Sequence, residues 1–237
     1  SRPGVPTPAH SSATPSAPLK ALQRHPVAAD NNCLFTSCAL LCGAHGSVRE
    51  LGQAASNLRA MCAENVRTDP DLETRLVLLG VGSVEEYMAW ILDDRHWGGE
   101  PEILMIAQHY NVEVVVSSAE SLRLLRYASP SSQPTEVVYL LYTGQHYDPL
   151  LGPPPTITKR FPTGDRETRA REREEAAIQI AIEHREADKR QKAELLAGSA
   201  DLGELGIEQQ PLEQVEQVLQ GLDIQGSEGY DQIPGFV

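Results

Sequence analysis

Two short segments of the sequence carry the residue types that a thiol nucleophile and its base require. The first, Asp30-Asn31-Asn32-Cys33, opens an apolar run, and the second, Gln145-His146-Tyr147-Asp148, closes the last apolar run before a proline-rich break. A reactive cysteine needs a base for its proton, and the base needs a group that orients it. The two segments lie at opposite ends of a stretch of domain size, so one fold can bring them together.

The position of Cys33 favours a reactive thiol. A free cysteine is mostly protonated at neutral pH, so a nucleophile needs a group that stabilises its thiolate. We expect a helix over residues 33–43, whose unpaired first N–H groups and dipole favour an anion at Cys33. These N–H groups are candidates for an oxyanion hole, together with those of the loop before Cys33, where Asn31 and Asn32 suit a tight turn. In the alternative interpretation Cys33 is a packing residue, as we predict for Cys38, Cys42 and Cys62.

His146 is the candidate base. Residues two apart in a strand face the same side, so a strand that begins at His146 projects this histidine and Asp148 together. Asp148 then accepts a hydrogen bond from one ring nitrogen and leaves the other for Cys33. Asp30 is the second candidate for the orienting role, or it braces the loop before Cys33. The sequence leaves both assignments open.

The stretch between the two motifs predicts helices first and strands afterwards. Ser47 with Glu50, and Ser83 with Glu86, have the spacing of a capping box, and Pro101 suits the first position of a helix. Runs of β-branched and aromatic residues follow. We predict helices over 33–43, 48–66, 85–94 and 102–110, and strands over 112–116, 122–127, 136–142 and from residue 146 onward. This order predicts an α+β domain with a small β-sheet packed by helices.

Composition divides the chain into five predicted segments. Residues 1–20 are rich in Pro, Ser and Ala and are predicted to be disordered, residues 21–152 form the domain, and 153–164 are a Pro-rich linker. Residues 165–197 predict a long charged helix with opposite charges three and four positions apart. Residues 198–237 are predicted to be an acidic, mostly disordered tail. After Lys192 the chain has nine Asp or Glu and no Lys or Arg.

Charge and composition exclude several classes of protein. The net charge of −13 argues against non-specific nucleic-acid binding, because phosphate contacts need a basic surface. No apolar run is long enough for a membrane span, and the N-terminus lacks the pattern of a signal peptide. The four cysteines lack zinc-site spacing, so we expect free thiols, no metal and no cofactor. We expect a monomer in the cytoplasm, and in the nucleus as well.

Four motifs follow one another along the predicted domain. They are Val27–Phe35 (VAADNNCLF), Thr68-Asp69-Pro70, Trp97-Gly98-Gly99-Glu100 with Glu102-Ile103, and Tyr142–Leu150 (YTGQHYDPL). In this order and spacing they resemble the ovarian-tumour (OTU) family of cysteine deubiquitinases, over residues 21–152. The residues of these motifs most resemble those of the branch of the family that is found with the valosin-containing AAA ATPase.

The resemblance implies a papain-like cysteine protease domain of the OTU type. In it Cys33 is the nucleophile, His146 the base and Asp148 the third member, while Asp30 lies at the family's other acidic position, in the loop that shapes the oxyanion hole. The implied reaction is hydrolysis of the isopeptide bond at the C-terminal glycine of ubiquitin, without a metal. Protein quality control and the unfolded protein response are the implied setting.

The resemblance also implies residues that contact substrate. Trp97, Gly98 and Gly99 match a loop that lines the substrate channel, Gln145 belongs to the loop that guides the ubiquitin tail, and the Asn31-Asn32 loop completes the set. A narrow slot suits a tail that ends in Gly-Gly, because the tail has no side chains there. For Trp97 the alternative is a buried core residue.

The implied partners are ubiquitin or polyubiquitin chains and the valosin-containing ATPase. That branch carries an N-terminal ubiquitin-like module that docks on the ATPase and a C-terminal zinc finger. Neither is visible in this sequence, which has no cysteine after Cys62. Glu172–Glu186 loosely resembles a ubiquitin-interacting motif, but Arg185 stands where a serine is expected, and we interpret it as a solvated charged helix. Two other functions stay open: an inactive ubiquitin-binding adaptor, and a thiol protease for another ubiquitin-like modifier.

Overall fold

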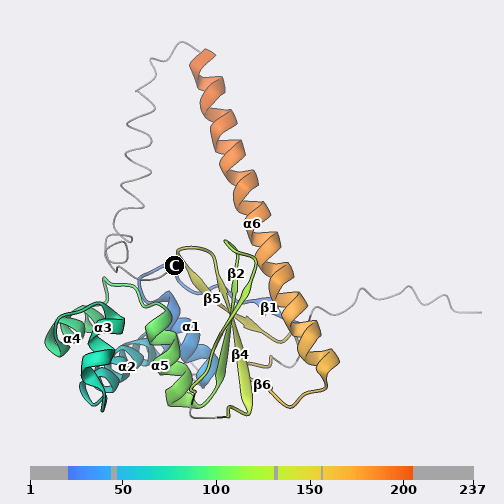
Figure 1. Cartoon of the computed structure of the whole chain (residues 1–237). Helices are drawn as coiled ribbons and strands as arrows, with labels where there is room; N and C mark the ends of the chain where they lie inside the picture. The colour runs from blue at the N-terminus through green and yellow to red at the C-terminus, as the bar shows by residue number, and fades with distance from the viewer. Residues whose placement is uncertain (1–20, 44–46, 131–132, 156, 205–237) are drawn as a thin grey trace, which may run out of the picture.

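The computed structural model describes residues 21–43, 47–130, 133–155 and 157–204 (Figure 1). Its helices are α1 (Cys33–Cys42), α2 (Val48–Arg67), α3 (Leu72–Leu79), α4 (Val84–Leu92), α5 (Glu100–Tyr110) and α6 (Glu167–Glu204). Its strands are β1 (Gln23–Arg24), β2 (Glu113–Ser118), β3 (Leu124–Tyr127), β4 (Glu136–Tyr142), β5 (Tyr147–Leu151) and β6 (Phe161–Pro162). The predicted N-terminal segment 1–20, and the predicted tail after residue 204, lie outside the described residues.

One mixed sheet with the strand order β1-β5-β4-β2-β3 forms the centre of the domain. β2 and β4 are parallel, whereas the pairs β1–β5, β5–β4 and β2–β3 are antiparallel. β6 pairs with the beginning of β4, beyond the residues that pair with β5. The strand of the second motif, β5, therefore lies between β4 and a strand from the beginning of the domain.

Different helices cover the two faces of the sheet. Val114 and Val138 belong to a core with α1, α2, α4 and α5, whereas their strand neighbours Val115 and Tyr139 pack with residues of α6. Figure 1 shows α1–α5 on one side of the sheet and α6 running along the other. This α+β arrangement of a small sheet between helices is the predicted fold class. Within the described parts of the chain, no helix combines the length and apolar character needed to cross a membrane.

Helix starts follow the capping residues that the sequence indicated. The Ser47 hydroxyl accepts a hydrogen bond from the Glu50 N–H, and the Glu50 carboxylate accepts one from the Ser47 N–H, which completes a capping box. Ser83 caps α4 in the same way, but the Glu86 carboxylate accepts from the Gly82 N–H instead. α5 begins at Glu100, so the following proline takes its second position rather than the predicted first. β5 begins at residue 147, one residue later than predicted.

Three elements were not predicted from the sequence. α3 begins after Asp71, whose carboxylate accepts a hydrogen bond from the Thr74 N–H, and ends at Gly80 in the left-handed conformation. No residue of α3 is fully buried, although Leu72, Leu76 and Leu79 lie at helical spacing and pack against the core. β1 and β6 have two residues each, which is too short for an alternating pattern.

The packed unit continues past the domain boundary predicted at residue 152. β6 lies inside the predicted linker 153–164 and pairs with β4. In the same segment Arg160 donates hydrogen bonds to the carbonyls of Leu41 and Cys42 at the end of α1. α6 then continues to Glu204, into the segment predicted to be a mostly disordered tail.

The prediction of a solvated helix is wrong for the part of α6 that lies on the sheet. Ala177, Ile180 and Ala181 are buried there with Leu22 and Leu150. The small alanine side chains let the helix approach the strands, while most charged residues of this part point outward. Ala181 lies in the stretch that resembles a ubiquitin-interacting motif, so this apolar face is used within the fold.

We expect Ala177→Asp to lower the free energy of unfolding by about 3 to 5 kcal/mol, because it places an unpaired carboxylate in a closed apolar contact. Urea unfolding followed by circular dichroism measures the change. Ala187→Asp lies on the exposed side of the same helix and is the matched control, with little effect expected. Equal effects of the two substitutions would contradict the packing of α6 on the sheet.

Candidate active site

Cys33 is the first residue of α1, and α1 packs on β5, the strand of the second motif. The Ser37 hydroxyl, one turn further along α1, donates a hydrogen bond of 3.0 Å to the carbonyl of Tyr147. This bond ties the helix to the strand at the residue next to His146. The Cys33 side chain is largely buried, yet it lines a cavity, so the fold presents the thiol to one side only.

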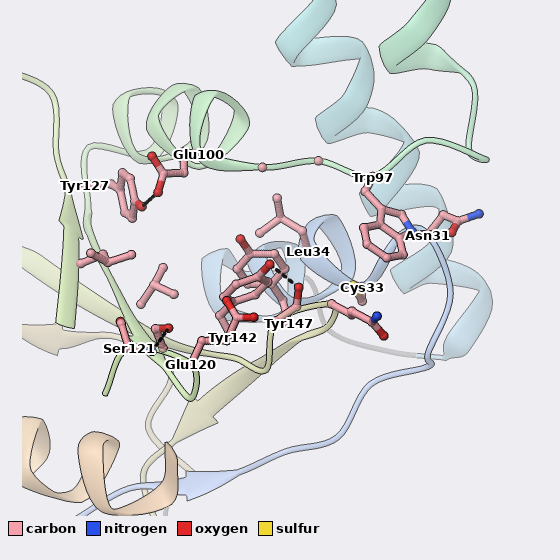
Figure 2. A pocket seen from close by; sticks show the side chains of 17 residues that line it. Asn31, Cys33, Leu34, Trp97, Glu100, Glu120, Ser121, Tyr127, Tyr142 and Tyr147 are labelled. Carbon is pink, nitrogen blue, oxygen red and sulfur yellow. Dashed lines mark hydrogen bonds between the residues drawn. The ribbon is translucent and has the colours of Figure 1, made fainter. Parts of the chain in front are cut away.

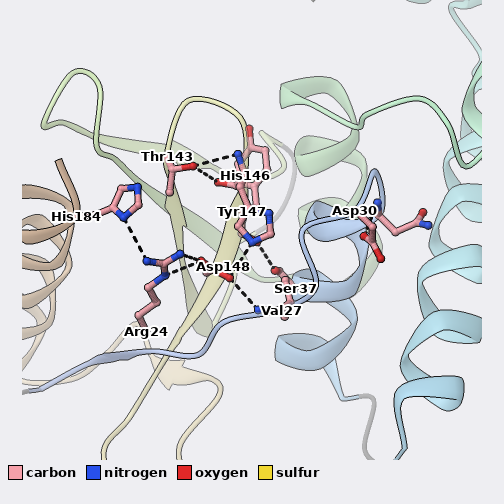
Figure 3. A network of polar contacts seen from close by, with 10 residues as sticks. Arg24, Val27, Asp30, Ser37, Thr143, His146, Tyr147, Asp148 and His184 are labelled. Carbon is pink, nitrogen blue, oxygen red and sulfur yellow. Dashed lines mark hydrogen bonds and ion pairs between the residues drawn. The ribbon is translucent and has the colours of Figure 1, made fainter. Parts of the chain in front are cut away.

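His146 and Asp148 form a hydrogen-bonded pair beside α1 (Figure 3). The His146 Nε2 lies 3.0 Å from Asp148 Oδ1, and the Asp148 side chain has no exposed surface. Asp148 Oδ1 also accepts a hydrogen bond from the Val27 N–H, and Oδ2 accepts one from Arg24 Nε. Because Nε2 is taken by Asp148, Nδ1 is the ring nitrogen left for the Cys33 thiol.

The charges at this pair favour the imidazolium form of the histidine. The hydrogen bond with Asp148, followed by the one with Cys33, raises the pKa of His146 from 6.5 to about 9, against the effect of burial. Burial raises the pKa of Asp148, but hydrogen bonds from His146, Val27 and Arg24 outweigh it and hold this pKa below its ordinary value. The site thus places a positive imidazolium next to the Cys33 thiol.

Asp30 lies apart from His146 in Figure 3, and its hydrogen bonds stay in its own loop. Its carboxylate accepts a bond of 2.9 Å from the Asn32 N–H, and its carbonyl accepts one of 3.2 Å from the Cys33 N–H. Of the two carboxylates that the sequence left open, Asp148 is the one beside the histidine. The N–H groups of Asn32 and Cys33, predicted for an oxyanion hole, are engaged by the tight turn at Asp30.

A cavity of about 510 Å³ opens beside Cys33 (Figure 2). It extends from the thiol to Ser121 and Tyr127 at its other end, and the predicted substrate residues in its lining are Asn31, Trp97, Gly98, Gly99 and Gln145. Trp97 is partly exposed and donates a hydrogen bond of 2.6 Å from Nε1 to Asn31 Oδ1. Trp97 is therefore a wall of the cavity rather than a core residue.

Two glycines keep the cavity wall free of side chains. A Cβ at Gly98 would lie 2.6 Å from the ring of Phe35, so the close approach of backbone to ring excludes any larger residue. Gly144 has a φ of +105°, which L side chains rarely adopt, and a Cβ there would lie 2.7 Å from Glu120 Oε1. Both positions therefore contribute backbone without a side chain to the lining of the cavity.

Arg59 of α2 is a residue of this site that was not singled out from the sequence. Its guanidinium is buried over the ring of Phe35, 4.3 Å from the centroid. It donates five hydrogen bonds, to Asn32 Oδ1 and to the carbonyls of Asn31, Ile91, Asp93 and His96. These bonds join the loop before Cys33 to the segment before Trp97. A charged residue within the buried stripe of an otherwise amphipathic helix was the feature that could have revealed it.

The other three cysteines lie in the helical core. Cys38, Cys42 and Cys62 are buried, and burial raises the pKa of each thiol, to about 11 for Cys42. Across the described ranges, no group of three or more His, Cys, Asp or Glu is placed to hold a metal ion. Of the four thiols, the one that lines the cavity is that of Cys33.

The fold and the site together define a thiol protease: a cysteine at a helix N-terminus, with a histidine and a carboxylate from a neighbouring strand. Comparison with known families agrees with this class. The family described as OTU-like cysteine protease matches the chain over residues 28–147, which is just over half of its length. The chain belongs to the family of OTU-like cysteine proteases.

Individual relatives support the same family. Ubiquitin thioesterase OTU1 of Rattus norvegicus is 37% identical over 132 residues, which are 56% of this chain and 37% of that protein. Its namesake in Dictyostelium discoideum is 32% identical over 148 residues, 60% of this chain and 43% of that protein. A solved OTU domain in complex with ubiquitin has a TM-score of 0.57 at 26% identity, covering 70% of this chain and 88% of the other. The match thus spans less than half the length of these two curated relatives.

We expect Arg59→Lys to lower the free energy of unfolding by about 3 kcal/mol. A lysine has three donors where arginine has five, so at least two buried acceptors lose their partner at about 1 to 3 kcal/mol each. Urea unfolding measures the change, and Arg67→Lys at the exposed end of the same helix is the control, with a much smaller effect expected. An Arg59→Lys protein as stable as the wild type would show that the buried network is not needed.

We expect iodoacetamide to modify Cys33 selectively in the folded protein at neutral pH. Cys33 lines the cavity, whereas the other thiols are buried with raised pKa values. Peptide mass spectrometry after a short reaction identifies the modified residue. Cys33→Ala should abolish the modification and Cys38→Ala should leave it intact, and rapid modification of Cys42 or Cys62 would contradict this assignment.

Proposed function

We propose that the chain is a deubiquitinase that hydrolyses the isopeptide bond between the C-terminal glycine of ubiquitin and a lysine side chain. The observation that carries this proposal is the hydrogen-bonded pair of His146 and Asp148 next to Cys33, whose thiol lines the cavity. Membership of the family supports the reaction class. The name of the relatives, Ubiquitin thioesterase, and the solved OTU domain bound to ubiquitin support ubiquitin as the modifier.

The reaction proceeds in two steps through the Cys33 thiolate. The sulfur attacks the carbonyl carbon of the glycine, and His146 gives its proton to the lysine nitrogen as the C–N bond breaks. This leaves a thioester between Cys33 and ubiquitin. The neutral His146 then takes a proton from water as its oxygen attacks the thioester, and the thiolate leaves. Asp148 keeps the imidazole oriented throughout, and Asp30 braces the loop before the nucleophile.

The cavity is proposed to hold the Gly-Gly end of the ubiquitin tail. Trp97, Gly98, Gly99 and Gln145 line this cavity together with Cys33. A tail without side chains fits against the backbone of Gly98. This position has no side chain of its own, because the ring of Phe35 leaves no room for a Cβ on Gly98. Specificity for the tail then comes from its contact with this backbone, next to which a tail without side chains can lie.

The biological setting is proposed from the sequence resemblance. In this proposal the protein trims polyubiquitin chains in protein quality control, including the unfolded protein response, in the cytoplasm and the nucleus. The valosin-containing ATPase is the proposed partner. Affinity capture with this ATPase, with and without nucleotide, tests the association independently of hydrolysis.

Ubiquitin with a C-terminal electrophile tests the proposed function directly. We expect a covalent adduct with the wild type, no adduct with Cys33→Ala, and an adduct with Cys38→Ala, because that thiol is buried away from the cavity. A probe built on a related modifier is the specificity control. Reaction with that probe alone would assign the enzyme to another modifier, and folded wild-type protein without any adduct would favour the adaptor function.

We expect isopeptide hydrolysis to fall as the pH rises through about 9, the raised pKa of His146. Below this value the imidazolium is present and protonates the lysine nitrogen; above it the neutral ring cannot. In Asp148→Asn the decline should move to lower pH, because the largest cause of the raised pKa is removed. A ubiquitin thioester substrate, whose leaving group needs no proton, is the control and should stay active at high pH. An unchanged profile in Asp148→Asn would contradict the orienting role.

A further inference from the structure

We propose that Arg24 is a positioning residue for the catalytic histidine, and that α6 belongs to the catalytic unit because His184 holds Arg24 against Asp148. The inference rests on the proposed function and extends it to residues outside the segment 28–147 that matches the family. Arg24, Asp148 and His184 all lie beyond the ends of that segment. Figure 3 shows the four side chains in a row, from His184 through Arg24 and Asp148 to His146.

The strand register brings Arg24 to the carboxylate. Arg24 of β1 pairs with Leu150 of β5, and partners in an antiparallel ladder project to the same face. Asp148 lies two residues before Leu150 and therefore shares that face, which is the one covered by α6. Arg24 Nε and Nη2 each lie 2.6 Å from Asp148 Oδ2, while Oδ1 accepts from Val27 and His146. The two oxygens thus have separate partners, and Arg24 serves the oxygen that faces away from the histidine.

α6 contacts the same guanidinium from the other side. Arg24 Nη1 donates a hydrogen bond of 3.2 Å to His184 Nδ1, because a guanidinium can only donate. Burial and the nearby Arg24 charge lower the pKa of His184, which keeps this ring neutral and able to accept. The helix is fixed in this position by its apolar contact with the sheet, where Ala177 and Ala181 pack with Leu22, two residues before Arg24. The helix and β1 are therefore one packed unit next to Asp148.

This arrangement determines the direction of the carboxylate. Asp148 has no exposed surface, so the loss of the cation at Oδ2 would leave a buried charge partly unmatched. The carboxylate would then rotate or take up a proton, and His146 would lose its oriented acceptor. Arg24 touches neither substrate nor thiol, so its effect on turnover must pass through Asp148.

A double-mutant cycle on isopeptide hydrolysis tests this route. Arg24→Leu should lower kcat by about 10- to 100-fold with a smaller change in KM, since the base is misplaced while the cavity is kept. Arg24→Lys, which keeps a cation with fewer donors, should recover part of the loss. In the Asp148→Asn background Arg24→Leu should have little further effect. Equal losses in both backgrounds, or full activity of Arg24→Leu beside an active wild type, would overturn the proposal.

The titration of His146 by NMR separates this inference from the proposed function, because it needs no substrate. Arg24→Leu should lower the pKa of His146 relative to the wild type, and Arg24→Lys should lower it less. His184→Leu should shift the same titration in the same direction, whereas Glu186→Gln, on the exposed side of α6, should not. The loss of the Arg24 charge alone would raise the pKa of His146, so only displacement of the Asp148 carboxylate gives the expected fall. An unchanged or raised pKa of His146 in Arg24→Leu overturns the inference. A lowered pKa in a protein that fails to cleave ubiquitin supports it while overturning the proposed function.

Discussion

The buried carboxylate of Asp148 is the constraint on which the rest of the site depends. A charge without exposed surface must be matched by donors, because an unmatched charge in the interior costs several kcal/mol. Its donors come from β1, from the backbone of Val27 and from His146. The order β1-β5-β4 places β5 between two other strands, so that Asp148 can be buried and reached from β1 at the same time. The histidine is oriented as a consequence of this burial.

Arg59 is the second buried charged group of the site, and it holds the loop before Cys33. It is a buried cation whose five donors are matched by four carbonyls and one amide oxygen. The nucleophile is thus held between two buried charged groups, one that orients the base and one that holds the loop before Cys33 against the segment before Trp97. Each of the two groups uses partners from distant parts of the sequence, so both are fixed by the tertiary fold.

Local patterns were sufficient to predict the main elements and the residues with chemistry. Caps such as Ser47 and the β-branched run of β2 act over a few positions, and Cys33 and His146 stand in recognisable motifs. The remainder depends on contacts between distant segments. β1 exists because β5 pairs with it, and Arg24 gains its role only through the register of that pair.

The side of α6 that packs on the sheet could not be read from its charge pattern. The residues of α6 that pack on the sheet are mainly alanines, and alanine is equally common on the exposed side of a helix. Gly98 likewise looks like an ordinary turn residue in the sequence. The position requires glycine because the ring of Phe35, which belongs to α1, leaves no room for a Cβ. The role of Arg59 also depends on another part of the chain. The periodicity of a helix sequence does not predict which distant carbonyls a buried side chain will bind.

The distances along the chain between these partners have a consequence for the time at which the enzyme becomes reactive. Arg24 and Asp148 are 124 residues apart, and Arg24 and His184 are 160 apart. A chain that emerges from the ribosome presents Cys33 early, when β5 does not yet exist and β1 has no strand to pair with. The cysteine is then an ordinary thiol on an unfinished fold. The late arrival of β5 and α6 therefore delays a reactive nucleophile until most of the domain has been synthesised.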